Sequence, residues 1–458
     1  MLRSIRTAST GLLLLSALVI PAQASAVDPS ALPLAENYFP TLKPIIEAAV
    51  KESPRMVMRN LENAVAEQNR IAARAGQLPS VGGYMQFNPY QLDHRADAPG
   101  WRDTQKLYYN ASINQPVFHW GTLENNTRIA ELQKKITEGQ TAEAYRGLVQ
   151  EIRAQFMQMV LKKLQLARNE MAIQIARDQL AIAQTKLEKK VIAPGDMFMP
   201  RLNFDQAQLS ADRAREDLDN AKRAFAKLTG TDPFQDSQIP DILPAVTPAP
   251  ELLGGILAGH VANQDLNSYY LETLRRQIEV EKLNYKNANV RLRPNFNLQA
   301  GVSQDEQSYT ANIAQKYLLQ SRYVGVQVNW SIFDGFSARA AKANASTRRR
   351  QAELNYDEAR AALSEQTRAQ LKQLEFSSRS MELANRILDS NQGNVAGRKD
   401  DLARGLVSEA EVNAAKLGLV DAQINASAFR FDYLMKAGDF LSTMLEDPAL
   451  QNLPKSSL

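Results

Sequence analysis

Residues 323–336 read YVGVQVNWSIFDGF, and their side chains alternate between apolar and polar before the chain reaches Asp334 and Gly335. Successive side chains of a strand point to opposite faces, so this alternation predicts a β-strand with one apolar face. That face would carry Val324, Val326, Val328, Trp330 and Ile332. The opposite face contains only small or uncharged polar residues, namely Tyr323, Gly325, Gln327, Asn329 and Ser331.

Three further runs follow the same pattern. Residues 295–303 place Phe296 and Leu298 on an apolar face, residues 107–114 alternate similarly, and residues 81–87 form a weaker fourth run. Each run spans about 9 to 11 residues, the length of a tilted transmembrane strand. The alternative is a half-buried sheet of a soluble protein. Polar faces made of Asn, Gln, Ser, Gly and Tyr favour a water-filled lumen, with Phe296, Leu298, Val324, Val326, Val328 and Trp330 facing lipid.

Four strands are too few to close a barrel, because about eight is the smallest number in bacterial outer-membrane barrels. The sequence therefore predicts that several chains share one barrel. Past residue 26 no run approaches 18 consecutive apolar residues, so we expect strands rather than helices to make any membrane contact.

The chain contains two copies of one pattern at a fixed offset. Pro79 and Pro294 are 294 − 79 = 215 residues apart, and Phe118 and Phe333 keep the same offset. Further pairs are Tyr108 with Tyr323 and Asn114 with Asn329. In each copy the pattern predicts a helix, two strands, a very long helix and a returning helix. The expected segments are a signal peptide (1–26), a first repeat (27–231), a Pro-rich linker (232–252), a second repeat (253–446) and a tail (447–458).

The two longest predicted helices are longer than the helices of a compact domain. Residues 127–190 and 337–402 contain no Pro, and their apolar side chains recur at steps of three and four. About 65 residues at about 1.5 Å each give a rod on the order of 100 Å. The shorter helices, expected at residues 34–77, 201–229, 267–292 and 409–444, have the lengths to lie end to end in pairs beside each rod. The fold class is therefore mainly α, with coiled-coil hairpins and a four-strand β contribution.

Composition excludes several functional classes. The net charge is only +4, from 54 Lys and Arg against 50 Asp and Glu, which gives no support for nucleic-acid binding. The chain has no Cys, and its 3 His residues lie far apart in sequence. Thiol chemistry and thiolate metal sites are therefore excluded, and no nucleophile-base set or phosphate loop indicates an enzyme. We expect no catalytic residues, no metal and no cofactor.

The first 26 residues resemble an export signal. Arg3 and Arg6 precede the apolar run at residues 11–20, and small residues follow at the expected cleavage position. The apolar run is shorter than the roughly 20 residues of a membrane-spanning helix. Export followed by cleavage is therefore the prediction.

Taken together, residues 34–445 resemble the TolC family of outer-membrane efflux and secretion channels. The resemblance rests on two copies of an amphipathic helix, a strand pair and a long helix, with the turn sequences QPVFHWG (115–121) and WSIFDGF (330–336). It implies an outer-membrane homotrimer with a 12-stranded transmembrane barrel and a helical tunnel in the periplasm. It also implies a passive conduit, energised by an inner-membrane pump of the ABC, RND or a similar class through a periplasmic adaptor protein.

The resemblance assigns functions to the two helix-hairpin tips. In the family these tips close the tunnel and receive the adaptor, and here they match residues 193–196 and 404–408. The docking residues so implied are Pro194, Gly195, Gly405, Leu406, Val407 and Ser408. A Gly at each tip would permit the positive φ angle that reversal of a long helix requires.

The family also has an acidic pair at its constriction, and only its first member is present here. Glu411 matches that member, whereas Ala414 occupies the second position. A threefold ring of Glu411 would favour cations; the alternative is a solvated carboxylate near Arg404. Arg201 stands at a similar place in the first repeat (411 − 201 = 210), and we expect it to pair with Glu411 and hold the tips shut.

One alternative function stays open at this stage, a soluble periplasmic coiled-coil adaptor or scaffold whose strands form a small sheet. The transported substrate, and the choice between drug efflux and protein secretion, are not encoded in these patterns.

Overall fold

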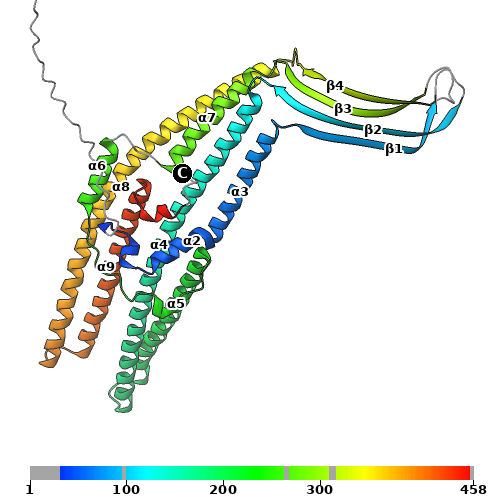
Figure 1. Ribbon diagram of the computed structural model, residues 1–458. Coiled ribbons are helices and arrows are strands. Elements are labelled where there is room, and N and C mark those ends of the chain that lie inside the picture. The colour runs from blue at the N-terminus through cyan, green and yellow to red at the C-terminus, as the bar shows by residue number, and fades with distance from the viewer. Residues whose placement is uncertain (1–30, 95–99, 263–267, 309–315, 454–458) are drawn as a thin grey trace, which may run out of the picture.

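The computed structural model describes residues 31–94, 100–262, 268–308 and 316–453. The molecule is elongated, with a body of long helices and a sheet that extends from one end of that body (Figure 1). The predicted signal peptide lies outside the described residues. Among the described residues, no helix combines the length and apolarity needed to cross a membrane.

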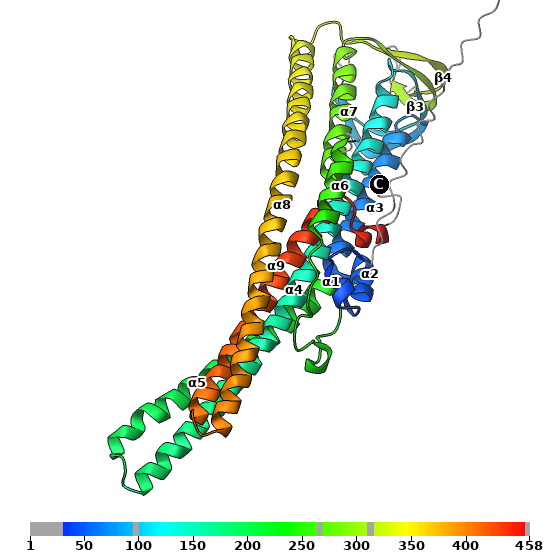
Figure 2. The ribbon, with the colours of Figure 1, turned by 90° about the vertical axis from the view of Figure 1, so that its left-hand side faces the viewer.

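Two very long helices span most of the body, as predicted. They are α4 (Thr122–Glu188) and α8 (Ser337–Ala403), and each has 67 residues. Shorter helices run beside them: α3 (Pro54–Ala75), α5 (Phe198–Thr229), α7 (Tyr269–Asn289) and α9 (Glu409–Thr443). In Figures 1 and 2, α3 and α5 flank α4, and α7 and α9 flank α8.

The prediction of one helix over residues 34–77 is wrong. The chain forms α1 (Ala35–Tyr38), α2 (Leu42–Glu52) and α3 instead. Ser53, which precedes Pro54, has an extended backbone (φ −61°, ψ 128°) because the proline ring disfavours a helical conformation of the residue before it. Pro54 then begins α3, where its missing N–H leaves no hydrogen bond unmade.

The four predicted strands form one antiparallel sheet in the order β1-β2-β3-β4. They are β1 (Ser80–His94), β2 (Trp101–Phe118), β3 (Asn295–Ser308) and β4 (Lys316–Asn329). With 14 to 18 residues each, they are longer than the predicted 9 to 11. The strand pairing continues beyond the alternating runs into polar segments. Trp330 and Ile332 lie beyond the end of β4, so their assignment to the strand is wrong.

The backbone repeats the predicted offset. Among the described residues, eight of the nine with positive φ form four pairs that are 215 positions apart, as in 335 − 120 = 215. The pairs are Trp120 with Gly335, Gly121 with Phe336, Lys190 with Gly405, and Gly230 with Leu445. A left-handed backbone costs a non-glycine residue roughly 1–2 kcal/mol. The shared geometry therefore persists even where only one member of a pair is glycine.

The main hydrophobic core surrounds the middle of α4. Tyr145, Ile152 and Phe156 of this helix are fully buried against both repeats. The Pro-rich linker packs here through Ile239 and Leu243, and a further helix, α6 (Pro250–Ala262), follows it. The segment expected to be only a linker is therefore part of the core.

Candidate functional sites on the sheet and the helix tips

One face of the sheet is apolar across all four strands. Val81, Ile113, Ala300 and Val324 pair in consecutive register and form one row of this face. The next rows toward the helices contain the pairs Leu298 with Val326 and Phe296 with Val328. The exposed fractions of Val324 (78%) and Val81 (76%) show that none of the described residues covers this row. The register thus places five of the six residues predicted to face lipid on one surface; Trp330 is the exception.

The opposite face is polar in the same register. Ser112, Gly301 and Tyr323 form one row, and Asn114 and Gln299 belong to another. The Gln299 amide donates to Gln327 Oε1 at 2.7 Å. A side chain at position 301 would lie 2.6 Å from the Tyr323 hydroxyl, so the Tyr323 ring needs glycine there.

The sheet and the helices are open on the same two sides. Among the described strands, β1 and β4 stand at the two ends of the sheet, and each has one unpaired edge. In the helical body, α4 contacts α3, α5, α7 and α9, whereas α8 contacts α7, α9 and, over a short stretch, α6. The lateral order is therefore α3 with α5, then α4, then α7 with α9, then α8. One open side consists of β1, α3 and α5, and the other consists of β4 and α8; we call them the α3 side and the α8 side.

Helix α3 carries exposed apolar residues. Leu61 is 57% exposed, Val65 60% and Ile71 47%, and all three project from α3. On the α8 side, Leu354 is 53% exposed. Long unpaired strand edges beside uncovered apolar helix faces favour association, because unpaired backbone groups and apolar surface both gain from a partner.

Both hairpin tips reverse by the same hydrogen-bond pattern. At the first tip the Val191 N–H donates to the Lys186 carbonyl at 2.8 Å, and at the second the Leu406 N–H donates to the Asp401 carbonyl at 2.9 Å. These bonds close left-handed turns at Lys190 (φ 58°) and Gly405 (φ 72°). The predicted positive φ angle at Gly405 is confirmed.

The predicted reversal at Gly195 is wrong. Gly195 lies without positive φ in the short 3₁₀-helix η2 (Pro194–Met197), five residues after the left-handed residue Lys190. A lysine in that conformation gives no sequence signal, since glycine is the residue expected there.

An acidic side chain caps the helix that follows each tip. The Asp196 carboxylate accepts from the Ala193 N–H at 2.9 Å, and the Glu411 carboxylate accepts from the Ser408 N–H at 2.8 Å. These two pairs are related by the offset of 215. The counterpart of Glu411 is therefore Asp196, and the predicted equivalence of Arg201 with Glu411 is wrong.

Within its own chain, Glu411 is an exposed residue that caps α9. Hydrogen bonds from the backbone and side chain of Ser408 lower the pKa of the Glu411 carboxyl group. Figures 1 and 2 show the two tips apart, with Arg201 on the hairpin of α5 and Glu411 on that of α9. An ion pair between them would have to form across two copies of the chain.

The tips differ in apolar exposure. Of the predicted docking residues, Leu406 is 70% exposed, and Pro194, Gly195, Gly405 and Ser408 are also exposed, whereas Val407 is partly buried. The first tip carries exposed apolar residues that the sequence analysis had not identified, namely Val191 (68%), Phe198 (67%) and Met199 (56%). Met197, in the 3₁₀-helix η2, is buried, whereas the neighbouring Phe198 and Met199 are exposed. The sequence gives no sign of this difference, because it depends on the 3₁₀ turn.

The comparisons with known proteins agree with this architecture. Residues 45–231 match the family model described as "Outer membrane efflux protein". The match covers 187 of the 458 residues, so the first repeat of the chain resembles the outer membrane efflux protein family. No curated protein sequence matches the chain.

Solved structures share the fold of this chain over nearly its full length. The Campylobacter jejuni CmeC outer membrane channel has a TM-score of 0.69 at 12% identity, covering 92% of each chain. The outer-membrane channel OprN has a TM-score of 0.67 at 14% identity, covering 94% of this chain and 96% of its own. The Vibrio cholerae outer membrane protein VceC has a TM-score of 0.65 at 14% identity, covering 90% of this chain and 98% of its own. These comparisons do not favour the alternative of a soluble adaptor.

A buried ion cluster, which sequence reasoning missed, ties α1 and the segment after α9 to α4. The Arg153 side chain is 1% exposed; its Nε donates to Glu36 Oε2 at 2.9 Å and its Nη1 to Asp447 Oδ2 at 2.6 Å. Burial alone would lower the pKa of Arg153, but the two carboxylates raise it by more. No motif reveals this cluster, because its members are 117 and 294 positions apart.

Proposed function

We propose that three copies of this chain form a passive exit channel in the outer membrane. The observation that carries the proposal is that sheet and helices are open on the same two sides. When the α8 side of one copy meets the α3 side of the next, strand edges and helix faces are covered together. The number three comes from the TolC-family resemblance, which implies a 12-stranded barrel.

The faces of the sheet support a membrane location. In a barrel of this sheet, the apolar rows would contact lipid and the Asn, Gln, Ser and Tyr rows would line water. The long helices would continue the lumen as a tunnel in the periplasm. Such a conduit contains no chemistry of its own, so an inner-membrane pump would supply the energy through a periplasmic adaptor.

The tips are the proposed control point. Exposed Leu406, together with Val407 and Ser408, would dock the adaptor at the second tip, with Pro194 and Gly195 at the first. A ring of Glu411 carboxylates would make the entrance prefer cations. Glu411 also caps α9. A movement of its carboxylate at the constriction would therefore also change the hydrogen bonds at the start of that helix.

The repeat defines a cysteine pair that tests the assembly. Arg275 of α7 stacks over Tyr356 of α8 at 5.9 Å, so residue 276 lies level with residues near 355. Leu61 is the counterpart of residue 276 at the offset of 215, which places it level with Leu354. The two lie on opposite open sides of one copy and can meet only between copies.

The expected result is a disulfide between Leu61→Cys and Leu354→Cys in cells, giving a covalent trimer on a non-reducing gel. The natural chain has no Cys, so no background bridge competes. Leu61→Cys with Phe376→Cys is the matched control, because position 376 is exposed but about 33 Å further along α8, at 1.5 Å per residue. A disulfide needs Cα atoms within about 7 Å. Monomers only, or equal bridging by the control pair, would overturn the assembly.

A further inference from the structure

The two repeats differ at the place where their shorter helices meet end to end. In the first repeat, α5 ends beside the start of α3, and the Ser53 hydroxyl donates to the Leu228 carbonyl at 2.8 Å. Gly230 packs so closely there that an added Cβ would lie 2.3 Å from the Glu52 carbonyl oxygen. This junction is closed.

Among the described residues, the equivalent junction of the second repeat leaves a cavity. Ser268 and Thr443 are the counterparts of Ser53 and Leu228 at the offset of 215, and both line a cavity of 220 Å³. At about 30 Å³ per water molecule, this volume equals about seven waters. Protein interiors are normally close-packed, and the first repeat shows that this junction can be filled. The junction of the second repeat therefore has room for a ligand.

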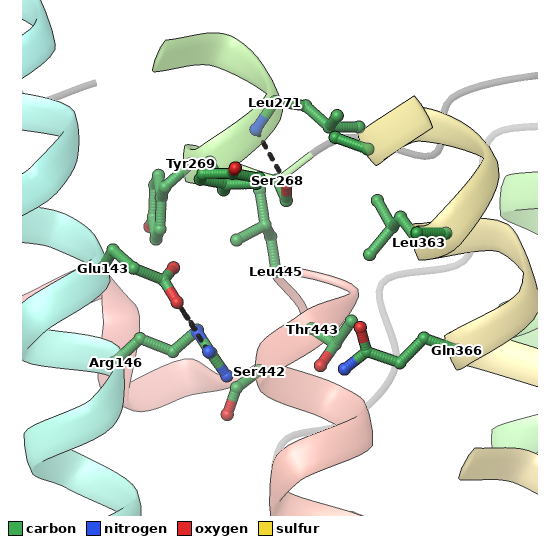
Figure 3. Close-up of a pocket in the computed structure, with 13 residues that line it drawn as sticks. Glu143, Arg146, Ser268, Tyr269, Leu271, Leu363, Gln366, Ser442, Thr443 and Leu445 are labelled. Carbon is green, nitrogen blue, oxygen red and sulfur yellow. Dashed lines mark hydrogen bonds and ion pairs between the residues drawn. The ribbon is translucent and has the colours of Figure 1, made fainter. Parts of the chain in front are cut away.

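The cavity has an apolar side and a polar side (Figure 3). Leu271, Leu363 and Leu445 line the apolar side, and the ring of Tyr269 lies beside them. Glu143 and Arg146 enter from α4, and the remaining polar groups are Gln366, Ser442 and Thr443. Tyr270, which also lines the cavity, is 56% exposed.

The charges around the cavity are negative in sum. Arg146 contacts two carboxylates, Glu143 at 2.6 Å and Asp439 at 3.5 Å, so the three groups together carry one negative charge. Burial raises the pKa of Tyr269, and the negative charges of Glu143 and Asp447 raise it further. The α8 residues that line the cavity, Ala359, Ala362, Leu363 and Gln366, are all uncharged.

We propose that this cavity binds a small organic cation with one aromatic ring, such as an aromatic quaternary ammonium. Aromatic faces and carboxylates attract such a cation together, because the ring quadrupole and the negative charge act in the same direction. The leucine side would hold the apolar body of the ligand. An anion would be repelled, since the Arg146 charge is already matched by two carboxylates. The site is independent of the proposed channel function.

The test is a titration of the full mature chain, purified in detergent, with benzyltrimethylammonium, followed by saturation-transfer NMR. Neopentylbenzene, which replaces the charged nitrogen by carbon at the same shape, is the control compound. We expect the cation to bind and its neutral analogue to bind at least about tenfold more weakly, because only the cation gains from the charge. Equal binding of the two compounds, or no binding of the cation, would overturn the proposal.

Three variants locate the site. Glu143→Gln should weaken cation binding about tenfold, because it removes the nearest carboxylate charge. Ala362→Leu should weaken it by occupying the cavity while the charge stays unchanged. Glu358→Gln is the matched control, since residue 358 is the exposed counterpart of Glu143 at the offset of 215 and should leave affinity unchanged. Thermal unfolding confirms that each variant is folded. Unchanged affinity in both Glu143→Gln and Ala362→Leu would contradict the assignment.

Discussion

Removal of the Asp447 charge should destabilise the chain far more than removal of an exposed charge. The Asp447 side chain is 0% exposed, and Arg153 beside it is 1% exposed. Asp447→Asn keeps the shape but leaves the buried guanidinium with Glu36 as its one carboxylate partner. Breaking one pair of a buried ion cluster costs about 3–5 kcal/mol, because the remaining charge is neither solvated nor fully paired.

This cost converts into a melting shift. At about 2.1 cal/mol/K per residue, unfolding of roughly 430 residues has an entropy of about 0.9 kcal/mol/K. We therefore expect Asp447→Asn to lower the melting temperature by about 4 °C in circular dichroism at 222 nm. Hydrogen exchange should also accelerate in α1 and in the 3₁₀-helix η4 (Pro448–Asn452), because Arg153 ties both elements to α4.

Two control variants distinguish the loss of a buried charge from a general sensitivity of the chain's stability to any charge removal. Glu170→Gln breaks the exposed pair of Arg215 and Glu170 (56% and 50% exposed) and should cost less than about 1 kcal/mol. Replacing Glu36, Arg153 and Asp447 together by Leu, Met and Leu should recover most of the loss, because no buried charge then remains. A melting temperature for Asp447→Asn no lower than that of Glu170→Gln would refute the reasoning.

Two further predictions concern caps and turns. Since hydrogen bonds from Ser408 hold the pKa of Glu411 below its ordinary value, the cap is complete above that ordinary value and is lost as pH falls through the lowered pKa. Glu411→Ala should therefore speed amide exchange at the start of α9 at neutral pH, since no side-chain acceptor remains for the Ser408 N–H, and an unchanged rate would exclude the cap. Gly230→Ala should lower stability by more than about 2 kcal/mol, because it adds a clash with Glu52 to the strain of φ 80°. Gly405→Ala should cost only about 1–2 kcal/mol, since open space surrounds it; equal melting shifts would contradict this difference.

The large elements were predictable because their signals are periodic and local. The absence of Pro and the apolar steps of three and four predicted α4 and α8 nearly to their ends, and alternation located all four strands. The helix at residues 34–77 was mispredicted because Pro54, which is compatible with a first helical turn, in fact begins a new helix. Strand ends were missed because pairing in a ladder depends on the neighbouring strand and not on alternation alone.

The candidate sites were predicted less completely, because they depend on tertiary contacts. The register places five of the six predicted lipid-facing residues on one face, and Gly405 has the expected positive φ. Arg201 was matched to Glu411 at an offset of 210, although the backbone repeats at 215 and so pairs Glu411 with Asp196. No local pattern encodes the cluster around Arg153 or the open junction at Ser268, since each joins segments that are distant in sequence.

The most direct test of the account is the electrical conductance of the purified mature chain in a planar lipid bilayer. If copies close into one barrel through their α3 and α8 sides, the bilayer should show discrete and uniform current steps. Those steps should persist after the disulfide between positions 61 and 354 has formed. A bilayer that stays electrically silent, although the protein is folded and inserted, would contradict the claim that these open sides close around a continuous lumen.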